Sequence, residues 1–260
     1  MRVVSHTCSN TEIVCALGEQ RRLVGVDTDS DFPPQIVEPL AKLGRDLELD
    51  ITATAALKPD LVLTSLTVPG HERIVEALKA TGLPVLVIDP IGLDGVYDSI
   101  MQIAEALGVL NKGRALAARM QAQMPPIEPR GARPKILVEW WPKPVIAPAR
   151  LSWINQLVRL AGGVNPFESR EGKSAEISDA DAIAAAPDAI VMSWCGVKEE
   201  KYRPDVVARR PGWSEVPAVK QRRIVPITEA FLGRPGPRLV EGYAALAKIM
   251  GSESFSEPAD

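Results

Sequence analysis

The sequence contains no long apolar run and few cysteines, and each shortage excludes a class of protein. Its longest apolar stretches, such as the one around residues 83–88, are far shorter than the roughly 20 residues of a membrane-spanning helix. Insertion into a membrane is therefore not expected. The three cysteines, Cys8, Cys15 and Cys195, form no CxxC spacing and cannot all pair. Neither a disulfide framework nor a zinc-binding cysteine motif is indicated.

Excess charge and histidine are also scarce. Lys and Arg number 30 against 33 Asp and Glu, which gives a net charge of −3, and both signs are scattered along the chain. Without a basic stripe, nucleic acid is not an expected partner. The only histidines are His6 and His71, which are too few for a multi-histidine cluster, so no metal site is predicted.

Motifs for catalysis are missing as well. The sequence has no G-x-S-x-G, no P-loop, and no G-x-G-x-x-G after its first predicted strand. We therefore expect a protein that is not an enzyme. One enzymatic alternative stays open, in which Cys8 beside His6, or Glu139 at a strand end, acts on a small molecule.

The sequence does contain an alternation of β-branched runs and helical patterns, which is typical of parallel strands joined by helical crossovers. Strands are predicted at residues 2–5, 23–26, 61–64, 85–88, 135–139 and 223–227. Helices are predicted at residues 11–17, 51–57, 72–80, 94–107, 112–124, 154–161 and 238–250. A chain of 260 residues, 46% of them hydrophobic, can form two α/β lobes with separate cores.

A weak internal repeat supports two related lobes. Residues 48–65 (ELDITATAALKPDLVLTS) align with residues 176–193 (EISDADAIAAAPDAIVMS). In both copies a helical pattern ends before a Pro-Asp turn that leads into an apolar strand, because proline cannot continue a helix. The alternative is a chance match, since this connection is common in α/β proteins.

We therefore divide the chain into three parts. They are an N-terminal α/β lobe at residues 1–111, a connecting helix and linker at residues 112–130, and a C-terminal α/β lobe at residues 131–260. A helix in the middle part, in place of a loose linker, would hold the lobes in a nearly fixed relation.

Residues that follow parallel strands face the crevice where open α/β sheets bind ligands. Cys8, Ser9 and Asn10 follow the first predicted strand. Ser9 and Glu12 also match the S-x-x-E capping box, in which the serine caps the helix and the glutamate returns the hydrogen bond. The two interpretations are compatible, so these residues are candidates for both roles.

Tryptophans follow two later strands. Trp194 lies beside Gly196 in the loop after the second repeated strand, and we interpret its indole as a ligand platform, with a core position as the alternative. Trp140 and Trp141 follow the strand at residues 135–139. At least one of this pair is expected in the core, and the other is a candidate to line a ligand cleft.

Several of these stretches together resemble the substrate-binding proteins of ABC importers. Residues 3–18 (VVSHTCSNTEIVCALG) and 57–62 (LKPDLV) resemble receptors for cobalamin, haem and iron-siderophores alike. The stretches that resemble the cobalamin-binding branch are residues 139–140 (EW), 160–163 (LAGG), 194–196 (WCG), 210–213 (RPGW), 216–219 (VPAV) and 231–239 (FLGRPGPRL).

This resemblance implies a non-catalytic receptor of the helical-backbone, class III type, with two Rossmann-like lobes joined by one long helix. The implied ligand is cobalamin or a related corrinoid, held in a cleft between the lobes without a protein-to-cobalt bond. The residues implied to face it are Cys8, Ser9, Asn10, Leu66, Thr67, Val68, Trp194, Phe231 and Arg234. Arg234 has a competing role, in which it ties down its own loop.

The family also docks onto an ABC permease through one surface carboxylate in each lobe, for which Glu72 and Glu199, or its neighbour Glu200, are candidates. Haem or an iron-siderophore is the alternative ligand; haem would need a Tyr, His or Met ligand, and a siderophore several basic residues. The sequence shows no leader, so we expect a periplasmic location if one was removed before Met1 and a cytoplasmic one if Met1 is native.

Overall fold

The computed structural model describes residues 1–129 and 131–251. Residue 130, at the end of the predicted linker, and residues 252–260, at the end of the predicted C-terminal lobe, lie outside the described residues. No helix in the described part of the chain is both long and apolar enough to span a membrane.

The chain divides into two compact units. The first comprises Met1–Pro90 and Asp94–Met120, and the second comprises Ile91–Leu93 and the chain from Gln121 onward. Each unit contains a parallel sheet with helices, so the predicted α/β fold class is confirmed. The connecting role of the helix predicted at residues 112–124 stays a prediction.

The sheet of the first unit has five strands, and all hydrogen-bonded neighbours run parallel. These strands are β1 (Val3–Ser5), β2 (Leu23–Val26), β3 (Ala41–Lys42), β6 (Leu61–Ser65) and β7 (Val85–Ile88). Their order across the sheet is β3-β2-β1-β6-β7. The central strands β1 and β6 are buried along their whole length, as expected for a sheet with both faces covered.

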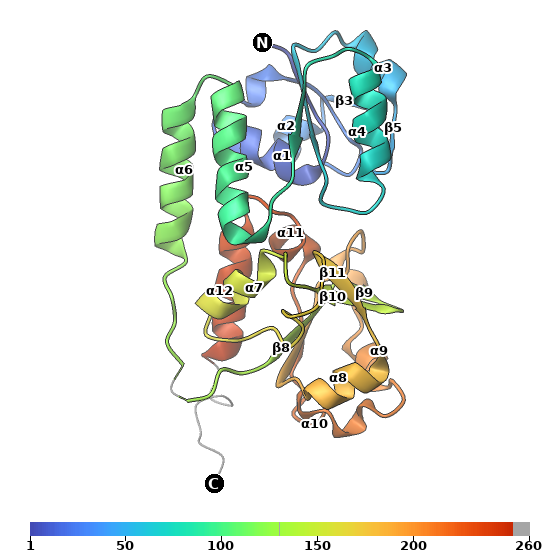
Figure 1. The fold of residues 1–260 in the computed structure, drawn as a ribbon, viewed down its shortest axis with the longest axis vertical. Helices are drawn as coiled ribbons and strands as arrows, with labels where there is room; N and C mark the ends of the chain where they lie inside the picture. Colours follow the sequence, from blue (N-terminus) through green and yellow to red (C-terminus); the bar gives the residue numbers. More distant parts are fainter. Residues whose placement is uncertain (130, 252–260) are drawn as a thin grey trace. The chain divides into compact units, whose positions relative to one another are not determined.

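Helices and a small hairpin surround this sheet (Figure 1). The helices are α1 (Cys8–Ala16), η1 (Gln20–Arg22), α2 (Pro34–Val37), α3 (Ile51–Ala56), α4 (His71–Ala80), and most of α5 (Gly92–Ala106) and α6 (Leu110–Gln123). The hairpin pairs β4 (Gly44–Arg45) with β5 (Glu48–Leu49) in antiparallel register. Leu43 and Leu49, which flank the hairpin, pack with Val62 and Leu78 in the core, so the hairpin is anchored to the sheet and to α4.

Helices α5 and α6 lie side by side in the first unit (Figure 1). Their close approach depends on Gly113 of α6, because a β carbon at that position would lie only 2.6 Å from the methyl group of Ala104 on α5. A small residue at the contact lets two helix backbones come together without displacing side chains.

The second unit has two three-stranded sheets. The parallel sheet contains β8 (Ile136–Glu139), β12 (Ala189–Met192) and β13 (Ile224–Pro226), in the order β13-β12-β8. The antiparallel sheet contains β9 (Trp141–Pro142), β10 (Val145–Pro148) and β11 (Ser174–Ile177), in the order β11-β10-β9. The helices are α7 (Ile154–Leu160), α8 (Asp179–Ala185), η2 (Glu199–Lys201), α9 (Pro204–Ala208), η3 (Trp213–Glu215), α10 (Pro217–Lys220), α11 (Glu229–Leu232) and α12 (Leu239–Met250). The antiparallel sheet was not predicted.

The internal repeat is confirmed, first by the way its helices begin and end. Asp50 caps α3 by accepting a hydrogen bond from a backbone N–H three residues on, and Ser178 caps α8 in the same way. Lys58 and Ala186 then leave the two helices with φ of 47°, a left-handed conformation that few non-glycine residues adopt. These positions correspond in the alignment, so the repeat holds at the level of backbone geometry.

The corner after each repeated helix is also the same. Asp60 accepts a hydrogen bond from the backbone N–H of Arg2, just before β1, at 2.6 Å, and Asp188 does so from Lys135, just before β8, at 2.8 Å. Arg2 and Lys135 each reach back with their side chains to a carbonyl at the end of the repeated helix. The Pro-Asp motif therefore ties the helix end, its following strand and the neighbouring strand together.

Candidate functional site

The most concentrated polar site in the first unit is centred on Asp46, between β4 and β5, and contains both histidines of the chain. His6 comes directly after β1 and is fully buried. Its Nδ1 lies 2.8 Å from the hydroxyl oxygen of Thr64 on the neighbouring strand β6, and its Nε2 lies 2.7 Å from the backbone carbonyl oxygen of Asp46. The ring is thus held at both nitrogens.

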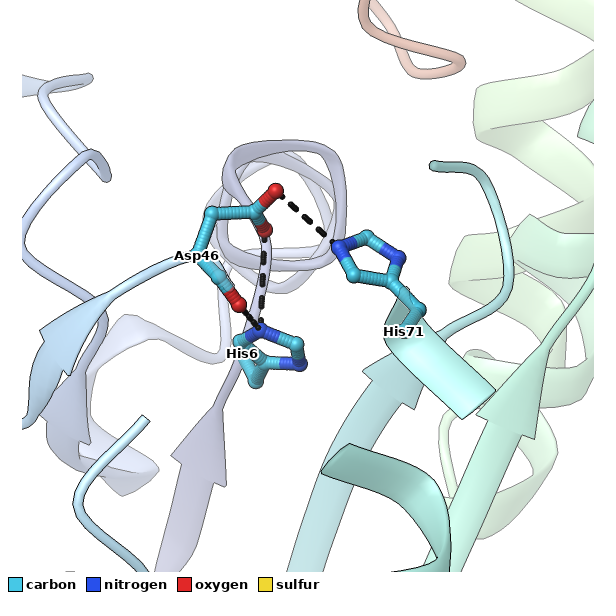
Figure 2. Close-up of side chains that lie close together, drawn as sticks. All are labelled: His6, Asp46 and His71. Carbon is cyan, nitrogen blue, oxygen red and sulfur yellow. Dashed lines mark hydrogen bonds and ion pairs between the residues drawn. The ribbon is translucent and has the colours of Figure 1, made fainter. Parts of the chain in front are cut away.

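His71 reaches Asp46 from the other side. It begins α4 and is also fully buried, and its Nε2 lies 3.0 Å from Oδ2 of Asp46. The backbone N–H of Val68 points at its Nδ1 from 3.4 Å. Figure 2 shows the two imidazole rings on either side of the carboxylate; their centroids are 5.2 Å apart in an edge-to-face arrangement. We call His6, Asp46 and His71 the His-Asp-His cluster.

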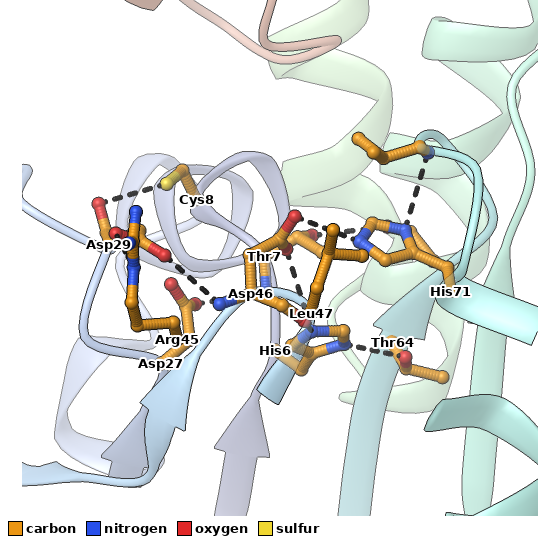
Figure 3. A network of polar contacts seen from close by, with 12 residues as sticks. His6, Thr7, Cys8, Asp27, Asp29, Arg45, Asp46, Leu47, Thr64 and His71 are labelled. Atoms are coloured by element: carbon orange, nitrogen blue, oxygen red, sulfur yellow. Dashed lines mark hydrogen bonds and ion pairs between the residues drawn. The ribbon is translucent and has the colours of Figure 1, made fainter. Parts of the chain in front are cut away.

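The hairpin holds Asp46 between the rings. Gly44 has a φ of +89°, which lets the chain turn tightly, and the backbone N–H of Asp46 donates to Oδ2 of Asp29 at 3.0 Å. Figure 3 shows the wider network, in which Asp27, Asp29 and Arg45 flank the cluster. The Asp46 side chain is 31% exposed, so the carboxylate is the part of the cluster that solvent reaches.

The hydrogen bonds define the protonation of the cluster. A backbone carbonyl only accepts, so His6 carries a proton on Nε2. Burial lowers the pKa of His6, which favours the neutral ring, and Nδ1 of that ring accepts from the hydroxyl of Thr64. Burial alone would raise the pKa of Asp46, but the hydrogen bond from His71 and the surrounding positive groups hold it below its usual range.

Stability of the first unit is expected to fall in mild acid because of His6. Its folded pKa is lowered, so below about pH 6.5 the unfolded chain binds a proton that the folded chain does not. Stability from this residue is present above that pH and is lost as the pH falls toward the folded pKa. The slope approaches at most about 1.4 kcal/mol per pH unit for one proton.

The measurement compares the wild type with His6→Gln by far-ultraviolet circular dichroism or by hydrogen exchange of β1 amides between pH 5 and 8. Intrinsic fluorescence is unsuitable, because all five tryptophans lie in the second unit. The variant should show a shallower dependence than the wild type. Equal slopes in the two proteins would contradict a neutral buried His6.

The predicted capping box is wrong. Helix α1 starts at Cys8, its N-cap is Thr7, and no side chain caps it. Ser9 is therefore inside the first turn, and its hydroxyl lies 3.3 Å from that of Thr7. Thr7 leaves β1 with a φ of 82°, so the chain turns into the helix earlier than the S-x-x-E pattern indicates.

The predicted ligand-facing residues of the first unit lie at the carboxyl ends of two neighbouring parallel strands. Cys8, Ser9 and Asn10 follow β1, and Leu66, Thr67 and Val68 follow β6. The hydroxyl of Ser65 bonds those of Thr7 and Thr67, which joins the two segments. Asn10 and Ser9 are buried, Cys8, Leu66 and Thr67 are half-buried, and Val68 is exposed. Contact with a ligand stays a prediction for all six.

The second unit has its own buried charged group. Glu139 ends β8 with no exposed surface, and the guanidinium of Arg210 binds both of its carboxylate oxygens. Burial raises the pKa of Glu139, while Arg210 and the indole N–H of Trp194 at 3.4 Å act in the opposite direction. Glu139 thus belongs to an internal ion pair.

Trp194 has the contacts of a core residue. It is 6% exposed, packs within the main hydrophobic cluster of the second unit, and lies against Tyr202 with ring centroids 5.3 Å apart. The interpretation as a ligand platform stays a prediction, and the receptor function does not depend on it. Of the tryptophan pair, Trp140 is buried against Trp153, so the expectation of at least one core residue is confirmed. Trp141 is 43% exposed, and a place for it in a ligand cleft stays a prediction.

The remaining candidates of the second unit are on or after α11. Phe231 is half-buried, and the guanidinium of Arg238 lies 4.8 Å from its ring centroid. Arg234 is 9% exposed, and its Nε lies 3.5 Å from a carboxylate oxygen of Glu229, a contact within its own loop region. A ligand contact by either residue stays a prediction. The docking candidates Glu72 and Glu199 are both exposed, and their role also stays a prediction.

Sequence reasoning missed the His-Asp-His cluster because it counted histidines alone. One signal was present, since the only two histidines follow adjacent strands of a predicted parallel sheet. Asp46 was not identifiable, because the two-residue strands β4 and β5 have no periodic pattern. The pairing of Cys8 with His6 does not occur either. The thiol of Cys8 donates to the carbonyl oxygen of Asp29 at 3.0 Å, and both His6 nitrogens have other partners.

Comparison with known proteins agrees with this architecture. A family model described as "Periplasmic binding protein" matches residues 3–230. An uncharacterised ABC transporter substrate-binding lipoprotein of Bacillus subtilis is 30% identical, over 98% of this chain and 82% of that protein. A vitamin B12-binding protein of Pectobacterium carotovorum is 24% identical, over 92% and 84%. The periplasmic haem-binding protein RhuT from Roseiflexus sp. RS-1, in its apo form, has a TM-score of 0.81 at 25% identity, over 98% and 99%.

Two α/β units, each with a parallel sheet, are the architecture expected of a two-lobed solute-binding protein. The chain belongs to the class III periplasmic binding protein family of ABC importers. It is therefore a non-catalytic substrate-binding protein, as the missing catalytic motifs predict. The enzymatic alternative with Cys8 or Glu139 is not supported.

Proposed function

We propose that this protein binds cobalamin or a related corrinoid and delivers it to an ABC permease. Relatives named as vitamin B12-binding proteins match over nine-tenths of the chain, and the stretches at residues 210–213 and 231–239 resemble that branch. The observation that carries the choice among ligands is the state of the histidines and tyrosines, which are the side chains that haem iron most often recruits.

Both histidines are out of reach of a macrocycle. The rings of His6 and His71 are fully buried, so iron at the centre of a broad porphyrin could meet their nitrogens only by displacing the residues that cover them. A corrinoid makes no such demand, because its cobalt does not require a protein ligand. The amide side chains around the corrin ring need only a few polar partners, and the ring itself needs apolar walls.

The tyrosines are equally unsuited to iron. The hydroxyls of Tyr202 and Tyr243 donate to the backbone carbonyls of Trp194 and Pro125. Burial raises the pKa of Tyr97, Tyr202 and Tyr243, which disfavours the phenolate that binds ferric iron. An iron-siderophore would need several basic side chains, and one of the arginines, Arg210, is already committed to Glu139.

Haem stays the second candidate, because the RhuT structure resembles this chain closely over its whole length. The two ligands are separated by titrating tag-free protein with hydroxocobalamin, haemin and a ferric siderophore in an isothermal calorimeter. We expect one corrinoid per chain with a dissociation constant of about 1 µM or tighter, and much weaker binding of the others. A tighter complex with haemin, showing a ligand-bound Soret band, would replace the corrinoid proposal with the haem one.

Trp194→Ala is expected to weaken corrinoid binding by about tenfold or more, because truncating a buried aromatic anchor commonly costs on the order of 1 to 3 kcal/mol. The matched control is Met192→Ala, which empties a fully buried position at the end of β12, two residues before Trp194. Calorimetry on both folded variants measures the difference. Equal affinities for the two variants would assign Trp194 to the core alone and remove it from the binding site.

A further inference from the structure

We propose that the His-Asp-His cluster binds one divalent transition-metal ion of the zinc class. The three residues come from three separate segments of the first unit, and one ligand atom of each lies within 4.8 Å of the other two. Figure 2 shows all three side chains pointing toward a common centre. Two imidazole nitrogens with one carboxylate oxygen form a donor set that zinc and its first-row neighbours prefer.

The spacing of the donor atoms fits such an ion. Zinc binds imidazole nitrogen and carboxylate oxygen at roughly 2.0 to 2.2 Å, which places tetrahedral neighbours about 3.3 Å apart. Nε2 of His71 lies 3.0 Å from Oδ2 of Asp46, and Nε2 of His6 lies 3.5 Å from Oδ1. The two contacts use different oxygens of the one carboxylate, and the three ligand atoms lie within 4.8 Å of one another, so the side chains must draw together around the ion. A fourth position would be left for water or an exogenous ligand.

The surrounding charge also favours a cation. Asp27 and Asp29 accompany Asp46 around His6, and Arg45 is the positive side chain facing them in this network (Figure 3). The partly exposed carboxylate of Asp46 gives the ion a path from solvent, while both imidazoles are buried. A cation therefore gains the attraction of the Asp46 carboxylate, and its two imidazole ligands are already out of solvent.

Metal binding would change the hydrogen bonds of both imidazoles. Nε2 of His6 would release the carbonyl oxygen of Asp46, and the proton would move to Nδ1, where the hydroxyl of Thr64 can accept it, so this ring keeps an outer partner. His71 would also carry its proton on Nδ1, opposite the N–H of Val68, and two donors repel. Loading should therefore turn the Val68 amide away, which provides a local readout of occupancy.

The test uses tag-free, chelator-treated protein titrated with Zn²⁺ by calorimetry and with Co²⁺ by visible absorption. We expect one ion per chain with a dissociation constant of about 1 µM or tighter, and intense visible bands from low-coordinate Co²⁺. In nitrogen-15 spectra the Val68 amide should shift on Zn²⁺ addition. Absence of binding at a severalfold excess of Zn²⁺ would overturn the proposal.

Asp46→Asn and His71→Gln should each lower the affinity about 100-fold, since even outer partners of metal ligands are worth roughly 10- to 100-fold. Glu76→Gln removes an exposed carboxylate from the same helix as His71 and should leave the affinity unchanged. Folded Asp46→Asn protein that binds as tightly as the wild type would show that the cluster is only a hydrogen-bonded brace.

A second measurement tests whether both histidines bind the ion, even if these variants do not fold. X-ray absorption of the monomeric Zn²⁺ complex reports the number of coordinated imidazoles without any mutation. The chain has only two histidines, so two imidazoles on one ion identify His6 and His71 directly. A spectrum with oxygen ligands alone would place the ion on surface carboxylates and overturn the assignment.

Discussion

Replacing Arg210 with leucine should lower the free energy of unfolding of the second unit by about 3 to 5 kcal/mol, because an unpaired buried charge is left behind. Glu139 has no exposed surface, and besides Arg210 the indole N–H of Trp194 contacts its carboxylate at 3.4 Å. The same guanidinium bonds the carbonyl of Pro142 and lies over the ring of Trp213 at 4.6 Å. Loss of this guanidinium therefore loosens the segments around Glu139, Pro142 and Trp213 together.

Thermal unfolding followed by tryptophan fluorescence measures this effect, since all five tryptophans are in the second unit. We expect the transition to fall by roughly 10 °C. The matched control is Arg209→Leu, whose 81% exposed side chain pairs with Asp205 at the surface and should contribute under about 0.5 kcal/mol. Similar losses in the two variants would argue against a buried ion pair.

The double variant Glu139→Leu with Arg210→Leu distinguishes the contribution of the ion pair from the cost of leaving one buried charge without its partner. Removing both charges leaves apolar side chains in an apolar site, so most of the stability lost in the single variant should return. A double variant as unstable as Arg210→Leu alone would mean that Arg210 acts through Pro142 and Trp213 rather than through Glu139.

Gly44→Ala should be the most damaging small substitution in the first unit, at about 3 kcal/mol. A residue with a side chain is strained at a φ of +89°, and the added β carbon would also overlap the carbonyl oxygen of Glu48 across the hairpin. The hairpin holds Asp46, so its loss should also disorganise the His-Asp-His cluster. Hydrogen exchange of peptides covering residues 41–50, together with calorimetric unfolding, measures both effects.

Gly82→Ala is the matched control for this prediction. Gly82 has a φ of +75°, close to that of Gly44, but a β carbon there meets no atom within 4 Å. The control therefore contains the backbone strain without the overlap, and we expect a loss of about 1 kcal/mol with normal exchange in the hairpin. Equal losses in the two variants would show that the Glu48 contact relaxes without cost.

The two units differ in the side chains that can report on them. Both histidines are in the first unit and all five tryptophans are in the second. Imidazole titration and metal binding thus follow the first unit, while indole fluorescence follows the second. Indole fluorescence alone would therefore report ligand binding to the second unit and miss changes in the first.

Local signals carried much of the fold prediction. The strands at residues 23–26 and 85–88 have the predicted bounds, since apolar β-branched runs end there at turn residues. The repeated Pro-Asp corner was visible because proline and aspartate act on their nearest neighbours. The start of α1 was misplaced, because the S-x-x-E pattern competes with the turn that Thr7 makes directly after β1.

The sequence by itself determined the α/β class, the repeated helix-turn-strand unit and the family, because each depends on periodicity or on residues close together in the chain. Tertiary structure alone decided which polar groups meet. It brought His6, Asp46 and His71 together from three segments, joined Glu139 to Arg210 across 71 positions, and buried Trp194 against Tyr202. Such contacts follow from sheet order and hairpin placement, which no local pattern encodes.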